Sequence, residues 1–400
     1  MSVTRVAILG ATGSIGQLAR DVVASHPGRF ELVGMAAGTR VEPLAEAASQ
    51  EAPWLRLRWL NVATAEARER LEALLPPAQK AGVEITVGED GLVAMAQAPE
   101  VDLVVVAVVG FAGLAPTLAA LRAGKRVALA TKESLVVAGH LVREAWRGGK
   151  GELFPVDSEH SALWQLLEGA RQRASRLYLT ASGGPFRTAS REAMAQATVE
   201  ETLRHPTWSM GPKITVDSAT LMNKGFEVLE AAWLFDMELD RIHVVVHPQS
   251  IVHALVAWPD GSLTAQLAVP HMRLPVERAM LYPDGAVESV PALDPTTLGT
   301  LHFEPVDRAR FPLLDAAYHA GKLGGTYPAV LNAADEIAVQ AFLDGRIRLV
   351  DIERVVHQVL ERHESHDAPD LETIREADRW ARHEAEDLCQ VLEGRSRVRS

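Results

Sequence analysis

The N-terminal stretch VTRVAILGATGSIG (residues 3–16) sets the fold, because a β-branched apolar run leads into three glycines and then a helical pattern. Glycines 10, 13 and 16 have GxxGxxG spacing, which lets backbone N–H groups approach a pyrophosphate at a helix N-terminus. The glycine spacing alone is weak evidence, because tight strand-to-helix turns also use glycine. The strand before it and the helix after it favour the binding function. The stretch predicts the first unit of a dinucleotide-binding parallel sheet.

The residues after the second predicted strand indicate which dinucleotide is bound. The strand FELVGM (30–35) is followed by AAGTR, and the acid that would bind a ribose 2′-hydroxyl is missing. Gly38, Thr39 and Arg40 stand there instead, and an arginine suits the 2′-phosphate of NADP. The alternative is that Arg40 is an ordinary solvated side chain.

Strand and helix patterns alternate through the first 130 residues. Strands are predicted at 57–62, 103–109 and 126–130, and helices at 65–75 and 114–123. This alternation predicts a doubly wound parallel sheet. The uncharged run 103–121 is long enough to imitate a membrane span, but Gly110, Gly113 and Pro116 interrupt it, so we interpret it as a buried strand leading into a helix.

Charged side chains follow two of the predicted strands. Lys132 lies after the strand 126–130, at a carboxyl end where such sheets bind ligands, although a lysine there could equally be a surface charge. The strand that starts at 151 ends in Asp157, Ser158 and Glu159. If this segment is extended, both carboxylates share a face and could bind one ion. The alternative is a helix N-terminus, where Asp, Ser and Glu are favoured.

The stretch HPTWSMGPKITVDSATLMNKGFEVLE (205–230) is rich in polar groups that could bind a ligand. Its ITV run (214–216) predicts a short strand, and Asp217 or Ser218 would cap the helix that follows. The capping residue would lie beside free backbone N–H groups, which attract anions.

The predicted helix after Ser218 would present an amide, an ammonium and a carboxylate. Asn223 and Glu227 project from one face, and Lys224 lies about 100° round from Asn223. The turn SGGPF (182–186) adds a hydroxyl and glycine amides that could bind a phosphate. The alternative is that Lys224 and Glu227 are ordinary surface charges and that Trp208 is a core residue.

The region from 242 to 269 has a period-two apolar pattern around the turn PDG (259–261), which predicts a β-hairpin in an antiparallel sheet. In an unbroken strand, His243, His247 and His253 would lie on one side. We interpret them as a sheet face or subunit interface, because the carboxylates offer a better metal site. Residues 283–307 form a proline-rich linker, and helical periodicity from 311 predicts a C-terminal bundle.

Composition excludes several classes of protein. The chain is 48% hydrophobic and 23% charged, with a net charge of −12, which disfavours a nucleic-acid or anionic-membrane surface. Its one cysteine, Cys389, excludes a disulfide framework and lies in a charged helical stretch. A phosphorylating semialdehyde dehydrogenase, which also starts with a GATG-type turn, is disfavoured because it needs a cysteine nucleophile. Cysteine usage and the absence of a signal-peptide pattern favour a cytoplasmic location.

Six motifs in order along the chain resemble one enzyme family: GATGSIG, ATKESLV, VDSEHSA, ASGGPF, HPTWSMGPKITVDSATLMNKGFE and HPQSIVHALV. They are similar to those of the 1-deoxy-D-xylulose 5-phosphate reductoisomerases of non-mevalonate isoprenoid biosynthesis, and the long central string is the specific one. The resemblance implies NADPH- and divalent-metal-dependent (Mg²⁺, Mn²⁺ or Co²⁺) rearrangement and reduction of this sugar phosphate to 2-C-methyl-D-erythritol 4-phosphate. It also implies a homodimer.

The resemblance implies a role for individual residues. The metal ligands would be Asp157, Glu159 and Glu227, and the phosphate site would be Ser182, Ser218, Asn223 and Lys224. The sugar hydroxyls would contact Lys132, Ser158 and His205, under a closing loop that carries Trp208 and Met210. NADPH would be lined by Thr12, Gly13, Ser14, Ile15, Gly38, Thr39, Arg40, Thr131, Glu133 and Gly211. The sequence departs from the common family pattern at Thr39, Arg40, Thr131 and His271.

The resemblance also implies four segments. They are a Rossmann-like NADPH-binding domain (1–155), an α/β catalytic and dimerisation domain with a partly antiparallel sheet (156–290), a linker (291–310) and a helical domain (311–400).

The alternative function is a non-catalytic NADP-binding sensor, which would keep the N-terminal turn without needing three acids and a phosphate pocket. Metal-dependent oxidation of NADPH with the ketose phosphate distinguishes the two.

Overall fold

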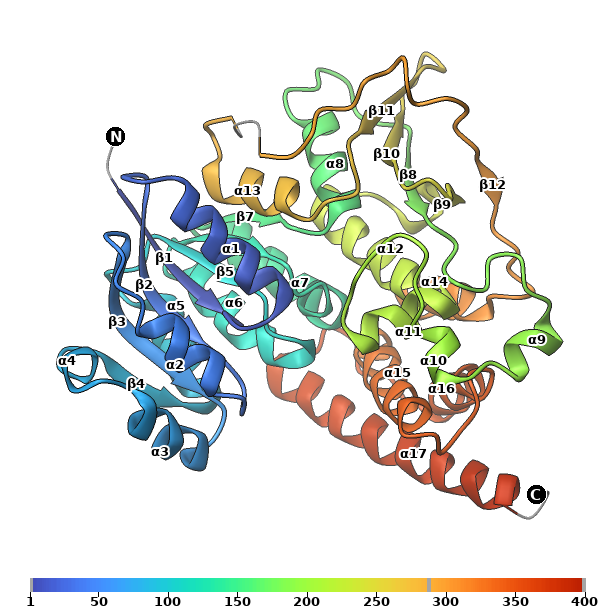
Figure 1. Ribbon diagram of the computed structural model, residues 1–400. Coiled ribbons are helices and arrows are strands. Elements are labelled where there is room, and N and C mark those ends of the chain that lie inside the picture. The colour runs from blue at the N-terminus through green and yellow to red at the C-terminus, as the bar shows by residue number, and fades with distance from the viewer. Residues whose placement is uncertain (1–2, 286–288, 398–400) are drawn as a thin grey trace. The chain divides into compact units, whose positions relative to one another are not determined.

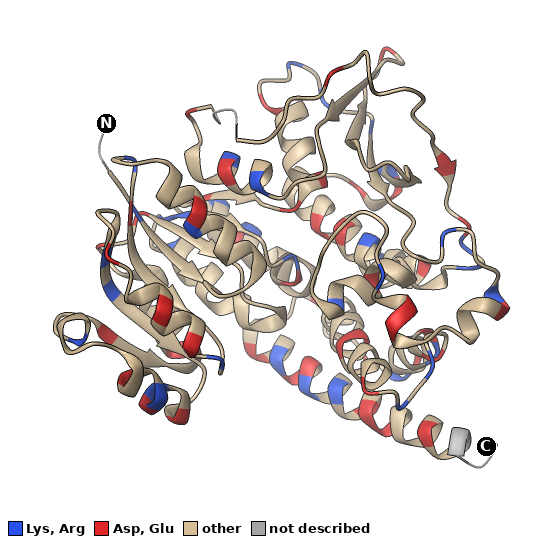
Figure 2. Ribbon diagram, viewed as in Figure 1, with Lys and Arg blue, Asp and Glu red and all other residues tan. Residues whose placement is uncertain are grey.

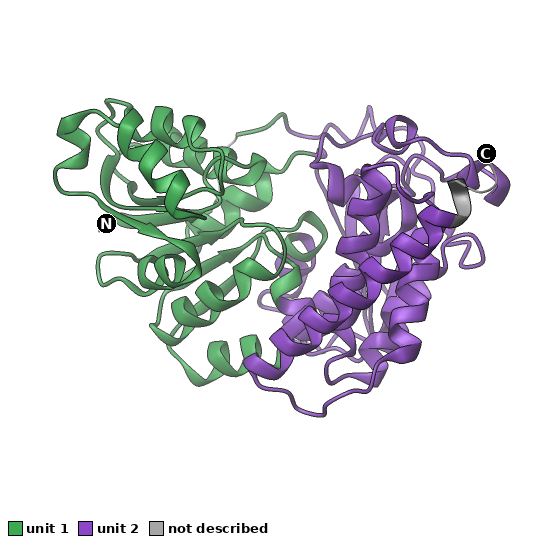
Figure 3. Cartoon of the chain, turned by 90° about the horizontal axis from the view of Figure 1, so that it is seen from below, with its two compact units in different colours: residues 1–134, 140–161, 271–291 green, residues 135–139, 162–270, 292–400 purple. Residues whose placement is uncertain are grey.

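The structure is a computed structural model that describes residues 3–285 and 289–397 (Figure 1). Contacts within the chain group it into two compact units (Figure 3). Unit 1 comprises residues 1–134, 140–161 and 271–291, and unit 2 comprises 135–139, 162–270 and 292–400. No helix in the described ranges is both long enough and apolar enough to cross a membrane.

Unit 1 is built on a seven-stranded sheet in the order β4-β3-β2-β1-β5-β6-β7. Every neighbouring pair is parallel, which confirms the predicted doubly wound sheet. The strand order reverses between β1 and β5, and such sheets bind ligands at this point, outside the carboxyl ends of the strands. The strands are β1 (Thr4–Leu9), β2 (Phe30–Ala36), β3 (Leu55–Val62), β4 (Glu84–Val87), β5 (Leu103–Val106), β6 (Arg126–Leu129) and β7 (Glu152–Pro155).

Helices connect these strands as the alternating pattern predicted. The run 103–121 forms β5, a short 3-10 helix and α6, so its interpretation as a strand and helix is confirmed. The helices that belong to or begin in unit 1 are α1 (Ser14–Ser25), α2 (Glu42–Ala48), α3 (Ala65–Leu74), α4 (Pro77–Lys80), α5 (Gly88–Gln97), η1 (Gly110–Gly113), α6 (Leu114–Arg122), α7 (Glu133–Gly148), α8 (Ser158–Leu167) and α13 (Arg273–Leu281).

Helix α13 joins unit 1 although it lies more than 100 residues after β7 in sequence. It packs against α1, β6 and β7, and the Arg126 guanidinium donates to the carbonyl groups of Met280 and Tyr282. At its start, His271 Nδ1 accepts the backbone N–H of Arg273 at 3.0 Å. His271 therefore satisfies an N-terminal donor of α13, as an acid at this position could.

Unit 2 contains a five-stranded mixed sheet in the order β11-β10-β8-β9-β12. The β8–β9 pair is parallel, and the others are antiparallel. Its core packs α12 residues such as Val228 against β8 residues such as Leu177 and Leu179. The strands are β8 (Arg176–Ala181), β9 (Ile242–Val246), β10 (Val252–Ala257), β11 (Leu263–Leu267) and β12 (Glu304–Pro305).

The predicted hairpin between 242 and 269 is only partly right. Strands β10 and β11 form a hairpin, but the predicted first strand is interrupted between β9 and β10, where Ser250 adopts a positive φ of 54°. The three histidines therefore do not lie along one strand. The His243 ring packs on Tyr178 at 5.4 Å, His247 stacks on Phe303 at 4.7 Å, and His253 lies 6.4 Å from the Trp208 ring.

The predicted C-terminal bundle consists of α14 to α17, but α14 also packs against α12, so contacts place the bundle in unit 2. Helix α17 carries both signs of charge along its length (Figure 2).

Burial raises the pKa of the Cys389 thiol on α17 to about 12, which excludes a reactive thiolate. The helices of unit 2 are α9 (Arg191–Ala195), α10 (Val199–Thr202), α11 (Pro212–Thr220), α12 (Met222–Phe235), η2 (Leu239–Arg241), α14 (Pro312–Leu323), α15 (Tyr327–Leu343), α16 (Asp351–Arg362) and α17 (Leu371–Arg397).

The strand predicted at 214–216 is wrong, because these residues lie inside α11. Pro212 occupies the first helical position, where its missing N–H and fixed φ suit a helix start. Val216 is fully buried, so packing outweighs the β propensity of this run. The helix continues to Thr220 and ends at Leu221, which has a left-handed φ of 59°. Ser218 therefore lies near the end of α11 and caps no helix.

Candidate active site

The glycine turn of unit 1 has the geometry expected of a pyrophosphate-binding turn. Gly10 has a φ of +92°, and a Cβ there would lie 2.3 Å from the Ala107 carbonyl oxygen. A Cβ on Gly16 would lie 2.1 Å from the Gly10 carbonyl oxygen, so neither position tolerates a side chain. Helix α1 starts after Gly13 with no side-chain cap and no acid in its first turn. Its N-terminus is therefore suited to an anion.

The other residues predicted to bind NADPH in unit 1 lie at strand ends. Gly38, Thr39 and Arg40 are exposed directly after β2, so Arg40 is available to a ligand. Thr131 follows β6 and is buried, and its hydroxyl donates to the Val108 carbonyl group. That bond fixes the Thr131 side chain against the backbone. Gly211, the remaining predicted contact, is exposed and lies in unit 2 as the N-cap of α11.

Two acids of unit 1 surround the start of α8. Because α8 begins at Ser158, the extended conformation predicted for Asp157 to Glu159 is wrong, and the helix N-terminus alternative describes the local structure. Asp157 Oδ1 accepts the Ser158 N–H at 3.0 Å, and the Ser158 hydroxyl donates to Glu159 Oε2 at 2.6 Å. The Lys132 ammonium, only 7% exposed, forms an ion pair with Asp157. The cluster offers hard oxygen donors beside a buried cation.

The third predicted acid, Glu227, is buried on α12 of unit 2 with 1% exposure. Asn223 Nδ2 lies 2.6 Å from its Oε1 atom, and Lys224 Nζ lies 2.5 Å from its Oε2 atom. Lys224 is itself only 4% exposed. The alternative that these two charges are ordinary surface groups is therefore wrong, because a buried ion pair needs a structural or chemical reason.

His205 links the two predicted phosphate-site serines within unit 2. Its Nε2 atom lies 3.0 Å from Ser182 Oγ and 3.1 Å from Ser218 Oγ. Its Nδ1 atom accepts the backbone N–H groups of Thr207 and Trp208 at 3.1 and 2.9 Å. The hydrogen-bond pattern therefore assigns the proton to Nε2. Burial lowers the pKa of His205 below its ordinary value, which favours this neutral form.

This tautomer sets the direction of the serine hydroxyls. Because Nε2–H is a donor, the oxygens of Ser182 and Ser218 act as acceptors toward it, and their own protons are free to point at a ligand. Gly184 N–H also donates to Ser182 Oγ at 3.1 Å. Two hydroxyl donors held by one neutral imidazole form a site suited to phosphate oxygens.

The loop between α10 and α11 carries the remaining predicted contacts. Trp208 and Met210 are both half-buried in it. A cavity of about 470 Å³ opens at Ser182 and is also lined by Arg187, Arg204, Pro206 and Pro248. Arg187 pairs with Glu304, and Arg204 pairs with Glu200. The lining of this cavity therefore includes two guanidinium groups and the Ser182 hydroxyl, all within unit 2.

Sequence reasoning missed one polar cluster in unit 2, formed by Lys213, Asp217 and Asp335. Asp217 and Asp335 are almost fully buried. Lys213 and Asp217 are four residues apart, which places them on one face of a helix. That spacing could have indicated a pair only if 214–216 had been interpreted as helical.

Comparisons with known proteins cover nearly the whole chain. A family model described as 1-deoxy-D-xylulose 5-phosphate reductoisomerase matches residues 6–139, and models of its C-terminal domains match 153–235 and 267–384. A Heliobacterium modesticaldum protein with this enzyme name is 50% identical over 398 residues, covering 98% of this chain and 99% of the relative. A Geobacillus protein of the same name is 49% identical, covering 93% and 96%.

Solved structures give the same result. The reductoisomerase from Zymomonas mobilis in complex with NADPH is 40% identical, with a TM-score of 0.88, covering 97% of this chain and 99% of that one. A DOX-P reductoisomerase in complex with NADPH, fosmidomycin and magnesium is 39% identical, with a TM-score of 0.92, covering 98% and 99%.

Proposed function

The chain belongs to the 1-deoxy-D-xylulose 5-phosphate reductoisomerase family, and we propose that Asp157, Glu159 and Glu227 hold the metal ion that its reaction requires. The activity is the NADPH- and divalent-metal-dependent rearrangement and reduction of 1-deoxy-D-xylulose 5-phosphate to 2-C-methyl-D-erythritol 4-phosphate. The alternative of a non-catalytic NADP sensor is not favoured, because the match to the enzymes extends beyond the nucleotide-binding segment.

The chemistry of the donors supports this metal assignment. All three residues offer carboxylate oxygens, which are the ligands that Mg²⁺ and Mn²⁺ prefer. Two of them are already balanced by an ammonium, Asp157 by Lys132 and Glu227 by Lys224. A bound divalent ion polarises a substrate carbonyl and stabilises negative charge on its oxygen, and NADPH supplies the hydride.

The phosphate of the substrate is assigned to Ser182, Ser218, Asn223 and Lys224. The observation that carries this assignment is His205 Nε2, which lies within hydrogen-bond distance of both serine hydroxyls. The hydroxyl protons are thus available to an anion, and Lys224 adds a positive charge. Holding the phosphate fixes the orientation of the reacting end of the sugar.

The remaining contacts follow from the same proposal. His205, Lys132 and Ser158 contact the sugar hydroxyls, and the loop with Trp208 and Met210 covers the substrate. The exposed Arg40 binds the 2′-phosphate of NADPH. The other NADPH contacts are Thr12, Gly13, Ser14, Ile15, Gly38, Thr39, Thr131, Glu133 and Gly211.

We also propose a cytoplasmic homodimer with the four functional segments 1–155, 156–290, 291–310 and 311–400. Strand β11 is an edge of the unit 2 sheet, with Leu263 and Leu267 61% and 37% exposed. An exposed apolar edge strand favours pairing with another chain. The buried, unreactive Cys389 is consistent with a reducing compartment.

The direct test is an assay of NADPH oxidation with purified protein. Oxidation should require both 1-deoxy-D-xylulose 5-phosphate and Mg²⁺ or Mn²⁺, stop with a chelator and resume when the metal is restored. Asp157→Asn should abolish the metal-dependent rate, whereas Asp367→Asn, at an exposed position, should not change it. A full rate in Asp157→Asn would remove that residue from the metal site.

A further inference from the structure

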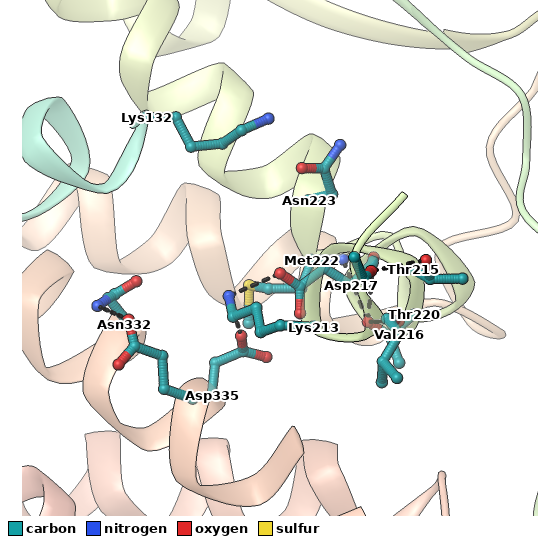
Figure 4. A network of polar contacts seen from close by, with 12 residues as sticks. Lys132, Lys213, Thr215, Val216, Asp217, Thr220, Met222, Asn223, Asn332 and Asp335 are labelled. Carbon is teal, nitrogen blue, oxygen red and sulfur yellow. Dashed lines mark hydrogen bonds and ion pairs between the residues drawn. The ribbon is translucent and has the colours of Figure 1, made fainter. Parts of the chain in front are cut away.

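Lys213, Asp217 and Asp335 form a cluster of one ammonium and two carboxyl groups inside unit 2 (Figure 4). Lys213 Nζ lies 2.6 Å from Asp217 Oδ2 and 2.9 Å from Asp335 Oδ2. Asp217 is 2% exposed and Asp335 is fully buried. Neither carboxyl group belongs to the proposed metal or phosphate sites.

The charges of this cluster do not balance if both carboxyl groups are ionised. In the described part of the chain, Lys213 is the one cation within ion-pair distance of either carboxylate. An uncompensated negative charge away from water is costly. Asp217 Oδ1 and Asp335 Oδ1 are also buried without a hydrogen-bond partner among the described residues. One proton on the pair would cancel the excess charge and supply the missing donor.

Surrounding groups favour retention of this proton. Burial, followed by repulsion from Asp335, raises the pKa of Asp217 well above its ordinary value, and burial also raises the pKa of Asp335. Glu336, on α15, adds repulsion to Asp335 and is itself paired with Arg382 of α17 at 2.6 Å. On α12 the cluster faces an apolar group, because Lys213 Nζ lies 4.7 Å from the centre of the Phe226 ring.

The cluster holds the helix that presents a phosphate-site serine. Lys213 lies in the first turn of α11 and Asp217 one turn later. The Lys213 ammonium pairs with Asp217 on its own helix and with Asp335 on α15, and so joins the two helices. Ser218 follows Asp217 directly, and its hydroxyl lies 3.1 Å from His205 Nε2. The position of this hydroxyl therefore depends on how α11 sits on α15.

We propose that Lys213, Asp217 and Asp335 form a positioning cluster that shares one proton between its carboxyl groups and holds α11 so that the Ser218 hydroxyl meets the substrate phosphate. The shared proton makes the cluster electrically neutral, so a rigid anchor can be buried beside an anion site without adding negative charge to it. The positioning role rests on the proposed phosphate site, whereas the shared proton does not.

Infrared difference spectroscopy of the full-length protein at neutral pH tests the shared proton. Asp217→Asn should remove a band of protonated carboxylic acid, because Asp335 remains as the ionised partner of Lys213. Asp335→Asn should remove the same kind of band, since Asp217 then takes the ionised role. The control Asp367→Asn, at an exposed position, should remove only carboxylate absorption. Loss of carboxylate absorption alone in both cluster variants would show two ionised groups and overturn the proposal. Both variants keep the charge balance and are therefore expected to fold.

Steady-state kinetics tests the positioning role. Lys213→Met should raise the KM for 1-deoxy-D-xylulose 5-phosphate about tenfold or more, with a smaller change in kcat, because the phosphate donors lose their alignment. Lys213→Arg should restore most of the affinity, and the exposed-lysine control Lys322→Met should match wild type. An unchanged KM in Lys213→Met beside a raised KM in Ser218→Ala overturns the positioning role. An unchanged KM in both overturns the phosphate assignment instead.

Discussion

Replacement of Glu227 by Gln separates its structural contribution from its role toward the metal. Glu227 is buried and accepts from Asn223 at 2.6 Å and from Lys224 at 2.5 Å. The amide keeps the shape and one acceptor oxygen, so the change removes mainly the charge. A hydrogen bond to a charged group contributes about 1.5–3 kcal/mol, and this is the expected loss of stability in the metal-free protein. At roughly 2–4 °C per kcal/mol for a unit of this size, the melting temperature should fall by about 3–12 °C.

Metal binding should change more than stability does. Because Glu227 is a proposed ligand, its loss should weaken Mn²⁺ binding at least about tenfold, the range found even for groups that only support a ligand. Electron paramagnetic resonance of free Mn²⁺ gives the affinity, and NADPH oxidation gives the turnover. The matched control is Glu238→Gln, because the Glu238 side chain is 80% exposed and lies 3.8 Å from its partner Arg241. This control should match wild type in melting temperature, Mn²⁺ affinity and turnover.

The double variant Glu227→Gln with Lys224→Met resolves the two roles. It removes both members of the buried ion pair, so much of the lost stability should return, because no charge is left buried without its partner. Binding of Mn²⁺ should stay weak. Wild-type Mn²⁺ affinity and turnover in Glu227→Gln would refute the metal assignment, and loss of the folded circular dichroism spectrum would indicate a purely structural role.

Three further predictions concern the cofactor, the loop and pH. Arg40→Ala should lower the kcat/KM ratio of NADPH to NADH, while Arg56→Ala, at an exposed position on β3, should not; an unchanged ratio would exclude Arg40 as the 2′-phosphate contact. Substrate or a phosphonate analogue should change Trp208 fluorescence relative to a Trp208→Phe control, and no change would contradict a closing loop. The lowered pKa of His205 means that its neutral form, which accepts the N–H groups of Thr207 and Trp208, is favoured in the folded state. The stability that neutral His205 contributes to the fold is therefore fully present above the ordinary histidine pKa, and it is lost as the pH falls through the lowered pKa of the folded state. In this acidic range the KM of the wild-type enzyme for the sugar phosphate should rise. A KM that is flat across this range would argue against the loop contact.

The sequence by itself determined the elements whose pattern is local. The GATGSIG turn, the alternating strands and helices predicted in unit 1, the turn that joins β10 to β11 and the helical C-terminal region all appear where the pattern predicted them. Each depends on features within a few residues, namely glycines that exclude a Cβ, apolar periodicity or a turn. Motif order along the chain was sufficient to indicate the family, which the comparisons confirm.

Only the tertiary structure decided how the polar residues are used. The run 214–216 prefers a strand by local propensity, but Pro212 and the burial of Val216 make it helical. Lys224 and Glu227 have the spacing of surface charges, and packing in unit 2 buries them as a pair. Asp217 and Asp335 are 118 positions apart, and the packing of α11 on α15 brings them to one ammonium. Local pattern sets the backbone conformation, whereas the burial and pairing of a charge depend on residues that are distant in sequence and meet only when the chain packs.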